Sequence, residues 1–78
     1  GMAIAANRFH GIRASVIWDA HEAKVTRNDD DSNILCLPAR VLEYEEDSDW
    51  QGIIETWLNT PFANATRFKR RNAQIDEL

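Results

Sequence analysis

The sequence has few of the cysteines and histidines that stabilise small proteins through disulfides or bound metals. It holds one cysteine, Cys36, so no disulfide can form within the chain. Two histidines without paired Cys or His spacing give no basis for a structural zinc site, and no metal is expected. A chain of 78 residues buries only roughly 60% of its unfolded surface. Association with another chain is therefore the expected source of further stability.

Long apolar runs and an excess of positive charge are also missing. No stretch approaches the ~20 residues that span a bilayer and no signal peptide is visible, so we expect a cytoplasmic protein without a membrane partner. Nine basic residues against 13 acidic ones give a net charge of −4, which argues against nucleic acid as a partner. A hydrophobic content of 44% with three tryptophans indicates a folded chain.

Two short apolar segments predict β-strands. Residues 12–18 are mostly apolar, with β-branched residues toward their end, and residues 33–37 form a second apolar run. The segment between them contains a capping box that begins at Asp19, which predicts a helix over 20–27 and a polar loop over 28–32. Strand, helix and strand at this spacing form a βαβ unit, so the two strands should be parallel.

Helical periodicity is strongest in the second half of the chain. Apolar residues recur there at intervals of three and four and define one helix face: Trp50, Ile53, Ile54, Trp57 and Leu58. Ser48 and Gln51 fit a capping box at its start, and Pro61 closes it. Residues 66–78 predict a final helix.

These elements predict an α/β fold in a single partial domain over residues 1–78. We expect part of a three-layer, Rossmann-like parallel sheet: a βαβ unit, two C-terminal helices and a possible helix over 2–8. Two or three parallel strands cannot protect both faces and both edges of a sheet. Another chain, or a missing N-terminal half, should complete it.

Basic residues mark a candidate anion site. The run 67–71 holds four of the nine cationic residues at the start of the last helix, where the helix dipole already favours an anion. Arg67 and Arg71 are four residues apart, share a face and could grip a phosphate together. The alternative is a solvated basic face, or ion pairs with the acidic segment 43–49.

Arg40 is a second anion candidate. It follows the second strand, and ligands of parallel α/β folds bind at the carboxyl ends of strands. A structural ion pair is the alternative for this residue.

Other reactive residues favour plain structural roles. Asp29, Asp30 and Asp31 lack the glycine and the distal glutamate of a calcium loop, so a solvated turn is expected. Cys36 lies between two leucines and should be a buried, inert thiol. The two histidines should lie on the surface.

Four ordered segments together match a known pattern. They are residues 4–9 running into Gly11-Ile12-Arg13-Ala14; residues 27–31 followed by Asn33-Ile34-Leu35; Ala39-Arg40; and Trp57-Leu58, Thr60 and Phe62 followed by Arg67 and Arg71. With them the chain resembles the C-terminal half of the ribose-5-phosphate isomerase B and galactose-6-phosphate isomerase family.

The resemblance implies an α/β/α sandwich, usually a dimer, whose sites are completed across the subunit interface. The family interconverts aldose and ketose phosphates through an enediolate without a cofactor. A cysteine thiolate shuttles the proton, a Gly-rich loop stabilises the oxyanion and a histidine helps to open the sugar ring. Arg40, Arg67 and Arg71 match the phosphate-binding arginines. A phosphorylated sugar is the implied ligand, and a homo-oligomer or a complementary N-terminal-half chain is the implied protein partner.

The departures from the pattern leave catalysis open. The family's Cys-Gly-Thr-Gly segment and its Asp-His pair would precede Gly1, and Cys36 matches a strand position. Asp29 stands at the position of the histidine and Asp30 at that of the following asparagine, which makes them the candidate catalytic residues of this half. The sequence is therefore compatible with an isomerase seen in part and inactive alone. The alternative is a non-catalytic module that binds a phosphorylated ligand or oligomerises.

Overall fold

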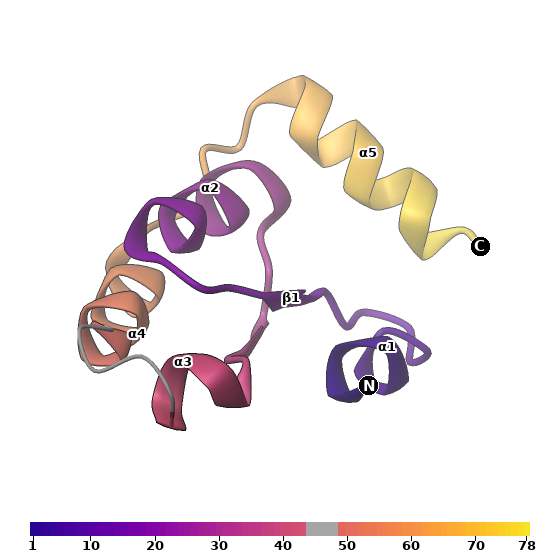
Figure 1. Ribbon diagram of the computed structural model, residues 1–78. Coiled ribbons are helices and arrows are strands. Elements are labelled where there is room, and N and C mark those ends of the chain that lie inside the picture. Colours follow the sequence, from indigo (N-terminus) through magenta and orange to yellow (C-terminus); the bar gives the residue numbers. More distant parts are fainter. Residues whose placement is uncertain (44–48) are drawn as a thin grey trace.

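The computed structural model describes residues 1–43 and 49–78, which form a small α/β domain with two strands and five helices (Figure 1). In chain order these are α1 (Met2–Ala6), β1 (Ala14–Val16), α2 (Ala20–Asp30), β2 (Ile34–Cys36), α3 (Ala39–Glu43), α4 (Trp50–Asn59) and α5 (Thr66–Asp76). The α/β class and both C-terminal helices are confirmed, whereas α3 was not predicted. No helix in the described part of the chain is long and apolar enough to cross a membrane.

The two strands are parallel, as the βαβ pattern predicted. Ala14 lies opposite Ile34 and Val16 opposite Cys36. An apolar run such as residues 12–18 is typical of a strand covered on both faces, but Val16 is 46% exposed. The helices of the described residues therefore do not cover both faces of this two-stranded sheet.

Helix α2 begins where predicted and ends three residues later than predicted. The Asp19 carboxylate caps it by accepting a hydrogen bond from the amide of Glu22 at 2.8 Å. Residues 28–30 were expected in a loop, but they complete the last helical turn. The helix stops at Asp31, whose left-handed backbone (φ 51°, ψ 46°) lets its amide bond back to the carbonyl of Arg27. Aspartate tolerates this conformation better than most residues do.

The core lies where α2, α3 and α4 meet the ends of the strands. It consists of Ile17, Ala23, Val41 and Ile53, with Leu35, Leu37 and Trp57 packed against it. In Figure 1 α2 and α4 lie together on one side of the strands, with α3 below them. The predicted apolar face of α4 is buried only in its middle: Ile53 is 2% exposed, whereas Leu58 at its end is 63% exposed.

Helix α4 starts at a cap that differs from the predicted one. The Asp49 carboxylate accepts a hydrogen bond from the amide of Gly52 at 3.0 Å, while Ser48 lies outside the described residues. A Cβ at position 52 would lie 2.0 Å from Asp49 Oδ2, so the cap relies on glycine there. The helix ends at Asn59, before Pro61, as predicted.

A side chain occupies part of the free edge of β1. The Asn7 amide accepts a hydrogen bond from the Ala14 N–H at 2.7 Å and donates one to the Ala14 carbonyl at 3.0 Å. Both backbone groups that Ala14 turns away from β2 are thereby satisfied. This contact holds the end of α1 against the strand.

Candidate functional site

Asp29, Asp30 and Asp31 close α2 and are called the acidic turn below. This turn lies at the end of the sheet where the two strands begin. Asp31 is held by Arg13, whose Nε donates to the Asp31 carbonyl at 2.9 Å and whose Nη2 lies 3.4 Å from the carboxylate. The Asp29 carboxylate accepts a hydrogen bond from the Asn28 side chain at 2.7 Å. The Arg13 contact fixes the backbone of the turn at Asp31, and the Asp30 carboxylate has no hydrogen-bond partner among the described residues.

Asp30 is brought close to helix α5. The Asn72 side chain donates to the Asp30 carbonyl at 2.9 Å, which places the second and third turns of α5 beside the acidic turn. Partial burial, followed by the charge of Asp29, raises the pKa of the Asp30 carboxyl, and the guanidinium of Arg71 opposes that rise. Two of the predicted site residues, Asp30 and Arg71, therefore act on each other electrostatically.

The start of α5 combines cations with unpaired amides. Ala65 provides no side-chain cap, so the first amides of the helix, those of Thr66 and Arg67, have no partner within the described residues. Phe68 is buried and packs near Phe62, with ring centroids 6.4 Å apart. The guanidinium of Arg67 lies 4.4 Å from the centroid of the Phe68 ring. Arg67 and Arg71 remain exposed, one turn apart.

Arg40 lies at the opposite end of the sheet. It belongs to α3, which follows the end of β2, while α5 adjoins the turn that precedes β2 (Figure 1). Its neighbours Trp18, Pro38 and Val41 line a depression of about 510 Å³ with it. Arg40 is exposed and takes part in no ion pair among the described residues. Within one chain, the structure does not bring Arg40 together with Arg67 and Arg71.

A second depression, of about 430 Å³, adjoins the acidic turn. Its polar lining comes from Asn7, Arg13, Ser15, Asp30 and Asn72. Sequence reasoning gave no role to Asn7, Arg13 or Asn72. Asn7 and Arg13 belong to a segment that carries the family resemblance, whereas Asn72 is marked only by its position directly after Arg71.

The remaining predictions concern reactive side chains. Both histidines, His10 and His21, are exposed as expected. Cys36 is a free thiol and is only half-buried, so its predicted full burial is wrong. No group of three or more His, Cys, Asp or Glu side chains within 1–43 and 49–78 could hold a metal ion. Ion pairs to the acidic segment 43–49, the alternative for the basic run, fall mostly outside the described residues.

Comparison with known proteins identifies the family. The family model described as Ribose/Galactose Isomerase matches residues 1–75. The chain belongs to this family. Ribose-5-P isomerase B of Listeria innocua is 36% identical over 76 residues, which cover 97% of this chain and 47% of that protein. The D-erythrulose-4-phosphate isomerase of Pectobacterium atrosepticum is 36% identical over 62 residues, covering 80% and 39%.

A solved structure of the same family is similar to this chain. The ribose 5-phosphate isomerase RpiB of Thermotoga maritima superposes with a TM-score of 0.86 at 40% identity, over 100% of this chain and 51% of that one. The chain spans about half the length of the relatives it matches. The partial parallel sheet is thus the fold of one half of this family's domain.

Proposed function

We propose that this chain is the phosphate-holding half of a sugar-phosphate aldose–ketose isomerase and that it does not turn over substrate alone. The observation that carries the proposal is the match of residues 1–75 to the isomerase family. The relatives act on phosphorylated sugars, as their names state, and a phosphorylated sugar is the ligand proposed here.

The start of α5 is the proposed phosphate contact. Its uncapped amides and the dipole of an eleven-residue helix favour an anion, and Arg67 and Arg71 add two charges on one face. An anion bound there would relieve the mutual repulsion of these cations and would offset the unfavourable position of Arg67 in the first turn.

A complete site would need more than one chain or a complementary half. Arg40 lies beyond the end of β2, whereas Arg67 and Arg71 lie beside its beginning. All three arginines can serve one ligand if Arg40 comes from a second subunit. We therefore propose either a homo-oligomer or assembly with a chain that supplies the other half.

The missing proton shuttle supports inactivity of the isolated chain. Its one cysteine, Cys36, is the last residue of β2, paired opposite Val16. The acidic turn offers Asp29 and Asp30 as proposed acid–base groups, and partial burial raises the pKa of the Asp30 carboxyl, which favours its protonated form. Neither is placed by the resemblance at the position of the proton-shuttling thiolate.

One observation favours a particular substrate class. By the resemblance Asp29 stands at the position of the ring-opening histidine, and a carboxylate accepts hydrogen bonds but donates none. A four-carbon sugar phosphorylated on its terminal oxygen has no hydroxyl that can close a five-membered ring, so it requires no ring opening. The relative named as a D-erythrulose-4-phosphate isomerase acts on such a compound. The second candidate function is a non-catalytic module that binds the same ligands or oligomerises, since Asp29 and Asp30 both depart from the family pattern.

The test has two parts: phosphate binding and turnover of sugar phosphates. Phosphate binding is measured by calorimetry for the wild-type chain and for Arg71→Ala, with Arg70→Ala as a control of equal charge change on the same helix. We expect loss of binding in Arg71→Ala only; equal loss in both variants would mean a diffuse charge effect. Turnover of ribose 5-phosphate and D-erythrulose 4-phosphate is then assayed with and without the unmatched half of the Listeria innocua relative. Activity of the chain alone would overturn the proposed dependence on a second half, and activity only with that half would exclude the non-catalytic module.

A further inference from the structure

The side chain of Arg27 joins three segments that surround the acidic turn. It lies in the last turn of α2, half-buried. Its Nη1 donates to the carbonyl of Ser32, in the short connection between α2 and β2. Its Nε donates to the carbonyl of Thr60 at 3.3 Å. Thr60 is the C-cap of α4, so Arg27 satisfies a carbonyl at the end of that helix.

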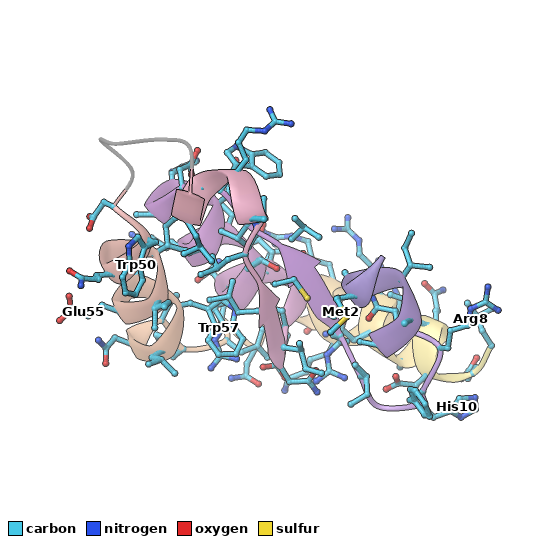
Figure 2. The ribbon with its side chains drawn as sticks, turned by 60° about the horizontal axis from the view of Figure 1, so that its bottom comes forward. Met2, Arg8, His10, Trp50, Glu55 and Trp57 are labelled. Atoms are coloured by element: carbon cyan, nitrogen blue, oxygen red, sulfur yellow. The ribbon has the colours of Figure 1, made fainter. Side chains whose placement is uncertain are left out.

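An indole ring completes the arrangement. The Arg27 guanidinium lies over Trp57, 4.6 Å from the ring centroid. The Trp57 Nε1–H donates in turn to the hydroxyl of Ser32 at 3.1 Å, and Ser32 is fully buried. Figure 2 shows Trp57 projecting from α4 toward the body of the domain, whereas Glu55 projects away from it. Arg27, Ser32 and Trp57 thus form a closed set of contacts, which we refer to as the Arg27 clamp.

The clamp lies between the acidic turn and the connection that leads to the candidate anion site at the start of α5. Asp29, Asp30 and Asp31 directly follow Arg27 and Asn28 along the chain. On the other side, Thr60 begins the connection to α5, and the Ala63 amide of that connection donates to the Asn28 carbonyl at 3.0 Å. The short segment from Thr60 to Ala63 is therefore fastened to the end of α2 at both ends.

We propose that Arg27 is the positioning residue of the candidate anion site: its guanidinium fixes the acidic turn against the end of α4 and so determines where α5 presents Arg67 and Arg71. The guanidinium itself is directed to Ser32, Thr60 and Trp57 and does not contact the ligand. A planar fork is needed for two carbonyls and a ring face at once, which a lysine cannot supply. This inference rests on the proposed phosphate site.

The prediction follows from how α5 is attached. Beyond the connection, α5 is held by the Asn72–Asp30 hydrogen bond and by the burial of Phe68. Loss of the clamp would let the acidic turn and α5 move relative to each other while both helices persist. We expect weaker phosphate binding by about ten-fold, by analogy with the loss found when outer-shell partners of metal ligands are removed.

The test compares Arg27→Lys and Arg27→Gln with wild type. Lys24→Gln, on the exposed side of α2, is the control for the loss of one positive charge. Circular dichroism establishes that each variant is folded, calorimetry measures inorganic phosphate affinity, and NMR follows the pH titration of the Asp30 carboxyl. We expect Arg27→Lys and Arg27→Gln to lose affinity alike and Lys24→Gln to retain it. In Arg27→Lys, which keeps the positive charge, the pKa of Asp30 should fall toward its ordinary value as the turn becomes solvated.

The outcomes separate this inference from the function on which it rests. If wild type binds phosphate and Arg27→Lys binds equally well, charge alone is sufficient and the positioning role is overturned. If wild type does not bind phosphate, the proposed phosphate site fails, and the titration of Asp30 decides. An unchanged titration in folded Arg27→Lys then overturns the positioning role, whereas a fall in the pKa supports it for the acidic turn itself.

Discussion

The side chain of Asn72 donates a hydrogen bond to the backbone carbonyl of Asp30, and this 2.9 Å contact attaches the outermost helix to the acidic turn. Helix α5 carries the cations of the candidate site, and α2 ends in its carboxylates. The bond therefore joins the two charged parts of the site through a neutral amide. It tolerates changes in the ionisation of Asp30 because it uses the backbone oxygen.

Replacing Asn72 by aspartate should separate α5 from the turn. The substitution conserves size and nearly conserves helix propensity, but it removes the donor and places a carboxylate near Asp30. We expect the free energy of unfolding to fall by about 1 kcal/mol, as measured by urea denaturation. Gln74→Glu makes the same charge change on an exposed position of α5 and should stay within about 0.5 kcal/mol of wild type. Equal losses in the two variants would contradict a specific role for the Asn72 bond.

The raised pKa of Asp30 predicts a pH dependence of stability. The folded chain binds this proton more tightly than the unfolded chain, so the contribution is fully present below the ordinary pKa of aspartate. It is lost as the pH rises through the higher folded pKa. The Asp30→Asn side chain is neutral at every pH, so this variant should be more stable than wild type at neutral pH. The free energies of unfolding of the two proteins should converge at about pH 3. Urea denaturation across this range tests it, with Glu55→Gln as the control; an Asp30→Asn variant less stable than wild type at neutral pH would refute it.

Trp57→Phe should lower the stability of the fold because it leaves the buried Ser32 hydroxyl without its donor. Phenylalanine retains a ring beneath Arg27 but removes the donor to Ser32, which is fully buried. The lost hydrogen bond and the space left by the smaller ring should together cost about 2 kcal/mol. Trp50→Phe, at a position 39% exposed, should cost less than about 1 kcal/mol. Thermal unfolding followed by circular dichroism compares them, and a similar loss in both would show that the Ser32 contact contributes nothing.

Asp49 and Gly52 should be energetically coupled. Asp49→Ala removes the cap of α4 and should cost about 1 kcal/mol. Gly52→Ala gains about 1 kcal/mol of helix propensity but forces the Asp49 carboxylate off its position, so it should be nearly neutral. In the Gly52→Ala background, Asp49→Ala should then have little effect. A double-mutant cycle measures the coupling, and strictly additive losses would disprove it.

Local signals were sufficient for most of the fold. Asp19 marked the start of α2 correctly because a side-chain cap is a property of adjacent residues, and Pro61 marked the end of α4 for the same reason. The end of α2 was missed because the left-handed backbone of Asp31 has no unique sequence signal. Helix α3 was missed because five residues held by the burial of Val41 show no periodicity.

The candidate site was predictable only in part. Arg67 and Arg71 were found from charge and spacing, whereas Arg27 received no role of its own because its partners Trp57 and Thr60 lie about thirty residues away. The grouping of Arg40 with the other arginines followed from the resemblance. Their separation follows only from the structure, because the Asn72–Asp30 hydrogen bond places α5 beside the turn that precedes β2, whereas Arg40 follows β2.

The amide of Asn7, bonded to both backbone groups of Ala14, also determines what can assemble on the sheet. It takes the place of one residue of a neighbouring strand, so an incoming strand can pair only further along, around Val16. Pairing is then restricted in register and in length. An open sheet edge normally invites growth into fibrils, but so short a free stretch templates it poorly. Strand pairing at this edge is therefore confined to the short stretch around Val16.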